Sequence, residues 1–103
     1  MNIKIPKSFQ LFGQTITVHF VPHLASENGN IGEARLGENK IYLQDNVEGR
    51  KMSKEQIEWV FLHELTHMIF SHMGEDELTQ NEILVDNFSR LLHQSLKTMK
   101  YKD

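Results

Sequence analysis

The segment from Ser53 to Met73 restricts the possible folds of this chain more than any other part of it. Ser53 is followed three residues later by Gln56, which is the spacing of a helical capping box, and Gly74 supplies a left-handed C-cap. Apolar side chains surround most of the helix that these signals predict, and a helix that is apolar nearly all round is buried. They are Ile57, Trp59, Val60, Phe61, Leu62, Leu65, Met68, Ile69 and Phe70. The polar residues on this helix therefore need a structural or chemical reason.

The chain before this helix alternates between apolar and polar residues, which predicts short β-strands. Two strands flank a turn at Gly13-Gln14, and two more flank a turn at Gly37-Glu38-Asn39, so each pair is expected to form a β-hairpin. The four segments are Ser8 to Phe12, Thr15 to Val21, Ile31 to Leu36 and Lys40 to Gln44. We therefore expect a small antiparallel sheet of three or four strands.

A second helix is expected near the C-terminus. Thr79 and Glu82 have the capping-box spacing, and an apolar stripe continues the helix to about Lys97. Because strands precede helices, the predicted fold class is α+β, a small antiparallel sheet followed by two helices. The length of 103 residues allows one hydrophobic core, so we expect a single domain over residues 1–103.

Composition removes several classes of function. The formal net charge is −3 and the isoelectric point is near 6.0, so no nucleic-acid binding is expected. The longest apolar run, Trp59 to Leu62, is far too short to span a membrane, and no membrane association is expected. The segment after Met1 lacks the apolar stretch of a signal peptide, which predicts a cytoplasmic protein.

The sequence His63-Glu64-Leu65-Thr66-His67 lies in the middle of the apolar helix. Residues four apart are separated by about 40° around a helix, so His63 and His67 can present two imidazole nitrogens to one ion. Glu64 lies about 100° round from His63, where it can reach a water held by a metal without binding the metal itself. The composition predicts about 0.03 chance occurrences of this motif. The chain has no cysteine, so a zinc site here must use His, Asp or Glu.

A hydrolytic zinc ion normally takes three protein ligands and a water, so a third ligand is needed. Glu82 is the candidate, because a short connection after Gly74 can fold it back against His63 and His67. Glu82 also has a plainer interpretation, since it can simply close the capping box with Thr79. Both interpretations stay open on the local sequence, and the preceding motif favours the ligand.

Asp86 follows Glu82 by four residues and therefore lies on the same face of the second helix. From there it can accept a hydrogen bond from a ligand histidine and so set the orientation of that ring. The plainer alternative is an ion pair between Asp86 and Arg90, which are also four residues apart. The motif again favours the role beside the metal.

The segment His63-Glu64-Leu65-Thr66-His67 followed by Glu82-Ile83-Leu84-Val85-Asp86 resembles the gluzincin metallopeptidases. The sequence from Glu82 to Leu92 follows soon after the first motif in a short chain. In this it further resembles the ImmA/IrrE-like peptidases of phages, mobile elements and bacterial stress regulation. The resemblance covers roughly residues 57–92. It implies a minimal zincin-like fold whose first helix carries the zinc motif.

The resemblance also implies an activity, that of a zinc-dependent endopeptidase, a hydrolase with Zn²⁺ held by His63, His67 and Glu82. Zinc would polarise the scissile carbonyl, and Glu64 would take a proton from the attacking water and deliver it to the leaving amine. Asp86 would orient a ligand histidine. The implied substrate is a protein or peptide, for example a helix-turn-helix repressor.

A peptide substrate should lie extended along an exposed sheet edge beside the cleft, and Ile31 to Leu36 is the predicted edge strand. A group that stabilises the oxyanion is also expected. The chemically suitable candidates are Tyr42, His72, His93 and Tyr101.

A function of a different class stays open, a zinc-containing regulatory or binding module that captures a protein partner without cleaving it. Glu64 discriminates between the two, because a structural zinc site has no use for an unliganded glutamate whereas hydrolysis requires one. A third hypothesis is an apolar helix with incidental histidines and no metal. Metal analysis of the purified protein would test it.

Overall fold

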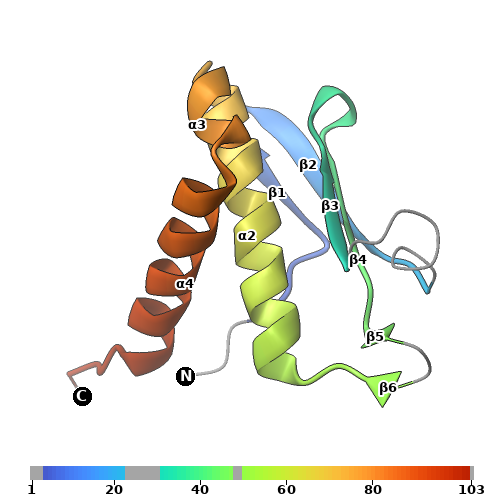
Figure 1. Cartoon of the computed structure of the whole chain (residues 1–103), viewed down its shortest axis with the longest axis vertical. Coiled ribbons are helices and arrows are strands. Elements are labelled where there is room, and N and C mark those ends of the chain that lie inside the picture. Colours follow the sequence, from blue (N-terminus) through green and yellow to red (C-terminus); the bar gives the residue numbers. More distant parts are fainter. Residues whose placement is uncertain (1–3, 23–30, 48–49, 103) are drawn as a thin grey trace.

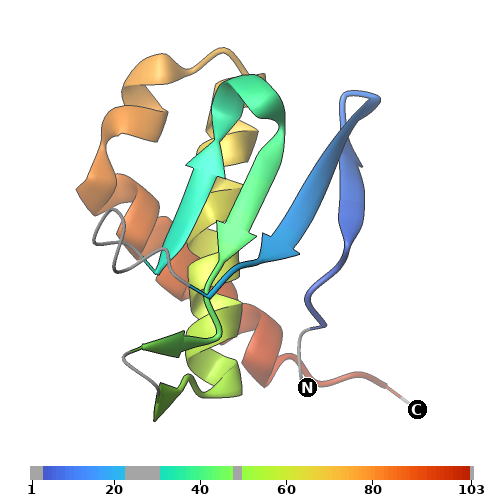
Figure 2. The same cartoon turned by 90° about the vertical axis from the view of Figure 1, so that its right-hand side faces the viewer.

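The computed structural model of this chain describes residues 4–22, 31–47 and 50–102. In it, the long helix α2 (Lys54–His72) lies between a four-stranded sheet and helix α4 (Glu82–Thr98), and the short helix α3 (Asp76–Gln80) joins the two (Figures 1 and 2). The strands of the sheet are β1 (Ser8–Leu11), β2 (Gln14–Phe20), β3 (Gly32–Arg35) and β4 (Lys40–Leu43). The short 3-10 helix η1 (Leu36–Glu38) follows β3. A separate two-stranded sheet pairs β5 (Asn46–Val47) with β6 (Arg50–Lys51). The predicted α+β class is confirmed. Among the described residues, no helix is both long and apolar enough to cross a membrane.

The first hairpin turns at Phe12-Gly13, one residue earlier than predicted. Both residues have positive φ angles, 49° and 77°, which is the backbone of a two-residue type I′ turn. Gln14 therefore belongs to β2, where it pairs with Leu11. The second hairpin turns through η1 and Asn39, whose φ is 55°. Both predicted hairpins are thus present.

The sheet is mixed, so the prediction of an antiparallel sheet was wrong. Its order is β1-β2-β4-β3, and β2 runs parallel to β4. Strand β4 takes one of the two inner positions, beside β2, where Ile41 and Leu43 are fully buried. Strand β3 carries Glu33 and Arg35, which pair at 3.4 Å, and charged side chains are best tolerated at a sheet edge. Strand β4 is the more apolar strand of the second hairpin. Its burial therefore explains why β4, and not β3, pairs with β2.

Helix α2 contributes side chains to the core on several sides, as its nearly continuous apolar surface predicts. Phe61 meets Phe9 of β1 edge to face, with ring centroids 6.2 Å apart, and Phe70 meets Phe88 of α4 at 5.8 Å. The main core cluster consists of Ile16, Ile41, Leu43, Met52, Val60, Phe61, Leu62 and Met68. The helix is thus held from both layers, which fixes the positions of the polar residues on it.

Both predicted ends of α2 are confirmed. At the start, Ser53 Oγ accepts a hydrogen bond from the Gln56 N–H at 3.1 Å. At the end, the Glu75 N–H donates to the Phe70 carbonyl and the Gly74 N–H donates to the Ser71 carbonyl, each at 2.9 Å. These two bonds form a Schellman motif, and the φ of 77° at Gly74 is the left-handed conformation that it requires.

The second predicted helix is divided in two, so the chain has three helices where two were expected. Asn81 separates α3 from α4 in an extended conformation, and its Oδ1 accepts a hydrogen bond from the Leu84 N–H at 3.1 Å. Asparagine is a preferred N-cap and here starts α4. The predicted capping box of Thr79 with Glu82 was therefore wrong, and both side chains are used elsewhere.

Candidate metal centre

An open cavity of about 610 Å³ lies between the edge of the sheet and the helices. Strand β3 and the turn η1 form one wall, α2 forms the floor, and α3 with the start of α4 forms the opposite wall. Its lining residues are Gly32, Glu33, Ala34, Leu36, His63, Glu64, His67, Asp76, Thr79, Gln80 and Glu82. The cavity thus brings together four of the five residues singled out in the sequence, and Asp86 lies behind one of them.

His63, His67 and Glu82 form a group that could hold a metal ion. Each offers one ligand atom, and these atoms all lie within 4.8 Å of one another. His63 Nε2 is 3.4 Å from Glu82 Oε2, and His67 Nε2 is 3.1 Å from Glu82 Oε1. Donor atoms about 2.1 Å from one tetrahedral ion are about 3.4 Å apart. The two contacts involve different oxygens of Glu82, and each is close to the separation expected of two ligands of one cation.

The convergence of these side chains follows from local structure. His63 and His67 are one turn apart on α2, and their ring centroids are 5.1 Å apart. The Schellman turn at Gly74 reverses the chain, and α3 carries it back along α2. Glu82 is then the first residue of α4, directly after the Asn81 cap, and its side chain is 68% exposed at the cavity.

Asp86 forms the predicted ion pair with Arg90 and lies near His63 without a hydrogen bond to it. Its Oδ1 is 3.6 Å from His63 Nδ1, while its Oδ2 accepts a hydrogen bond from Arg90 Nε at 3.0 Å. The Arg90 guanidinium also lies 4.1 Å from the centre of the Trp59 ring. Within the described residues, His63 Nδ1 is buried and has no hydrogen-bond partner. Asp86 is the nearest carboxylate to that nitrogen, and its bond to Arg90, which is itself packed on Trp59, restrains its position.

The surroundings of His63 lower the pKa of its ring and so favour the neutral form. Burial lowers the pKa of the imidazole, His67 lowers it further, and the nearby carboxylates of Glu82 and Asp86 oppose both effects. A histidine binds a metal through the lone pair of the neutral ring. The electrostatics around His63 therefore favour the protonation state that a ligand needs.

Glu64 is nearly buried, with 8% of its surface exposed, and it lines the cavity without belonging to the ligand group. Burial, followed by the charges of Glu82 and Glu33, raises its pKa to about 8, and a hydrogen bond from the backbone of Ala34 acts in the opposite direction. A divalent cation beside it would also favour the ionised carboxylate. Its chemistry is thus that of a group able to take up and release a proton.

Gly32 makes room for the Glu64 side chain. A Cβ atom at position 32 would lie 3.0 Å from Glu64 Oε2 and inside contact distance of Val60 Cγ1. The absence of a side chain lets β3 approach α2 closely at this point. The edge strand therefore touches the floor of the cavity beside Glu64.

Thr79 is a residue of the site that the sequence analysis assigned to a helix cap instead. Its hydroxyl lies 3.0 Å from His67 Nδ1 and donates a hydrogen bond to the His67 carbonyl at 3.1 Å. A signal was present in the sequence, because Asn81 is a better N-cap for a helix beginning at Glu82 and leaves Thr79 without a capping role.

The four candidates for oxyanion stabilisation lie away from the described lining of the cavity. Tyr42 alternates with the buried Ile41 and Leu43 and so lies on the outer face of the sheet. Its ring stacks on His19 and is covered by Arg35. The other three have partners at other places: His72 bonds Asn39, His93 bonds Glu58 between α2 and α4, and Tyr101 meets Met99. In this structure, none of the four side chains lies where it could act at the metal group.

Comparison with protein-family models, with curated proteins and with solved structures found no match for this chain. Its function is therefore argued from the geometry of the site.

Proposed function

We propose that this protein is a zinc-dependent endopeptidase. The observation that carries the proposal is the placement of Glu64, a nearly buried carboxyl group beside a ligand group of two imidazoles and one carboxylate that does not include it. Two histidines and a glutamate are a common ligand set of catalytic zinc, and three protein ligands leave one position open. A site that only stabilised the fold would gain nothing from an additional buried acid.

The residues of the chain divide the chemistry between them. His63, His67 and Glu82 would hold Zn²⁺, which when bound polarises a carbonyl and makes a water more acidic. Glu64 takes the proton of the attacking water and later delivers it to the amine that leaves. The hydrogen bond from the Ala34 backbone keeps the Glu64 carboxyl group turned toward the edge of the sheet. Asp86 lies 3.6 Å from His63 Nδ1 and would orient this ring once that contact shortens to a hydrogen bond.

The edge strand supports an extended peptide as the substrate. Strand β3 is at the end of the sheet order, as predicted for Ile31 to Leu36, and no strand of the described residues pairs with its outer side. The Gln44 N–H donates to the Ile31 carbonyl, and bonded pairs alternate along an antiparallel ladder. The backbone groups of Gly32 and the carbonyl of Ala34 therefore face the open edge, where the Ala34 N–H already donates to Glu64. A peptide could add there as a further strand.

The substrate class that the sequence resemblance suggests is a regulatory protein such as a helix-turn-helix repressor. An extended segment of such a protein, in a linker or an unfolded region, could reach the cavity along β3. This expectation rests on the resemblance, and the site itself asks only for an accessible peptide.

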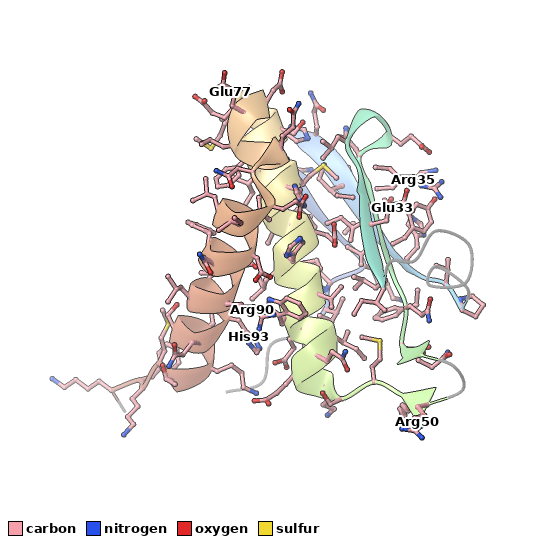
Figure 3. All side chains as sticks on the ribbon, in the orientation of Figure 1. Glu33, Arg35, Arg50, Glu77, Arg90 and His93 are labelled. Carbon is pink, nitrogen blue, oxygen red and sulfur yellow. The ribbon has the colours of Figure 1, made fainter. Side chains whose placement is uncertain are left out.

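The test compares wild-type protein with Glu64→Gln, using Glu77→Gln as a matched control because Glu77 is exposed on α3 and does not line the cavity (Figure 3). All three proteins should hold one zinc ion per chain and unfold at similar temperatures. Hydrolysis of a peptide library should fall at least about 100-fold in Glu64→Gln alone, because an amide cannot accept the proton.

The same variant separates cleavage from capture. Glu64→Gln should retain a protein partner that wild-type protein releases as shortened products. If both proteins capture the same partner and neither produces a shortened product, the peptidase proposal fails, and the binding-module hypothesis takes its place.

A further inference from the structure

The hydroxyl of Thr79 is shared between two groups of His67. It lies 3.1 Å from the His67 carbonyl oxygen and 3.0 Å from the ring nitrogen Nδ1. Thr79 is 7% exposed, so few water molecules can compete for these contacts. Its position is set by α3, which is too short to have a separate stability of its own and is held against α2.

A threonine hydroxyl has a single hydrogen to donate. The carbonyl oxygen of His67 has none, so the hydroxyl donates to the carbonyl and accepts from Nδ1–H. The opposite arrangement would point a hydroxyl lone pair at the carbonyl oxygen. The proton of the neutral His67 ring is therefore on Nδ1, which leaves a lone pair on Nε2.

The free lone pair of Nε2 points at another acceptor. Glu82 Oε1 lies 3.1 Å from His67 Nε2, and two lone pairs at this separation repel each other unless a cation or a proton lies between them. The tautomer that Thr79 imposes thus prepares His67 as a metal ligand and makes the His67–Glu82 contact favourable when a cation is shared.

We propose that Thr79 is a positioning residue that holds His67 in the Nδ1–H tautomer, with Nε2 directed at the metal. The proposal rests on the metal site of the proposed function but not on hydrolysis. It makes the two ligand histidines different, because His63 Nδ1 has Asp86 at 3.6 Å, beyond hydrogen-bond distance, whereas His67 is already oriented by a neutral hydroxyl.

The experiment compares Thr79→Val, which keeps the shape but removes the hydroxyl, with Thr79→Ser, which keeps the hydroxyl. In metal-free protein, nitrogen NMR of the imidazole rings should show His67 as the Nδ1–H tautomer in wild type and in Thr79→Ser, and a mixture of tautomers in Thr79→Val. Zinc affinity should fall about 10- to 100-fold in Thr79→Val and recover in Thr79→Ser.

Thr66→Val is the matched control, because the buried Thr66 hydroxyl donates to the Leu62 carbonyl at 2.7 Å and contacts no ligand ring in the described structure. It removes a similar bond and should leave zinc affinity and the His67 tautomer as in wild type. Thermal unfolding of each variant shows whether a change in affinity only reflects loss of fold.

Three outcomes would overturn the proposal: the Nε2–H tautomer of His67 in metal-free wild-type protein, wild-type zinc affinity in Thr79→Val, or equal losses in the valine and serine variants. The first of these outcomes is measured on wild-type protein, so it tests the proposal even if Thr79→Val does not fold. Each differs from a failure of the proposed function, in which zinc binds with these dependences but no peptide is cleaved.

Discussion

The pair of helices α2 and α4 carries histidine–carboxylate contacts at two places, and the two places differ in charge. Toward one end, Glu58 of α2 is 3% exposed and lies 3.1 Å from His93 Nε2 and 3.6 Å from Lys97 Nζ of α4. Toward the other end, His63 and His67 of α2 share the carboxylate of Glu82 on α4. In the first group a carboxylate is compensated by a lysine, whereas the second group contains no lysine or arginine.

The difference shows what distinguishes an ionic contact from a candidate metal site. Glu58 lies beside Lys97, which brings a permanent positive charge, and its contacts with Lys97 and His93 tie the two helices together. The His63–His67–Glu82 group offers several lone pairs to one point beside an open cavity and has no permanent positive charge of its own. A cation from solution would complete this group. The shortest histidine–carboxylate contact is 3.1 Å at both places, so contact length alone does not reveal the difference.

The largest expected effect is the loss of zinc when a ligand is removed. His63→Ala and His67→Ala should each lose stoichiometric zinc through purification, because two remaining ligands form too weak a site. His93→Ala removes a histidine from the other group and should keep one zinc ion per chain. Elemental analysis of the three proteins measures this, and full occupancy in both ligand variants would reject the assignment.

Replacing Glu82 and Glu58 by glutamine, one at a time, should distinguish the metal group from the ionic group further. Glu82→Gln should lose zinc with little change in stability, because Asn81, not Glu82, caps α4. Glu58→Gln should keep zinc and lose about 1–3 kcal/mol of unfolding free energy, since a buried charged hydrogen-bond acceptor is removed. Metal titration and chemical denaturation give the two quantities. Loss of zinc in Glu58→Gln at a temperature where the protein is folded would contradict the distinction.

A smaller effect is expected at Asp86, which belongs to the metal end without being a ligand. Asp86→Asn should weaken zinc affinity or peptide hydrolysis about 10- to 100-fold while the fold is kept. Arg90→Gln removes the other partner of Asp86 and should have a smaller effect on zinc, because an exposed ion pair contributes little to stability. If Asp86→Asn equals wild type in both assays, Asp86 serves only its pair with Arg90.

The smallest expected effect on zinc binding concerns the close approach of β3 to the cavity floor, which involves no ligand residue. Gly32→Ala should cost about 1–3 kcal/mol of unfolding free energy and reduce hydrolysis, because the added methyl group meets Val60 and Glu64. Gly37→Ala is the control, since a Cβ there meets no atom within 4 Å. Equal stability of the two variants would show that β3 can move away from α2 at no cost.

The sequence determined the local features of this protein. Ser53, Gln56 and Gly74 were sufficient to predict both ends of α2, since caps depend on residues within one turn of each other. The spacing of His63, Glu64 and His67 was sufficient to predict a shared helical face, because that geometry is set by the helical repeat alone.

Only the tertiary structure decided how these local pieces meet. The alternation in β2, β3 and β4 predicts strands but not their order. The inner position of β4 follows from burial of Ile41 and Leu43. In the same way, Thr79 has the spacing of a cap, and it contacts His67 only because Asn81 starts α4 and α3 packs on α2. Strand order and contacts between helices depend on which surfaces are buried together, and residues far apart in the chain make that choice jointly.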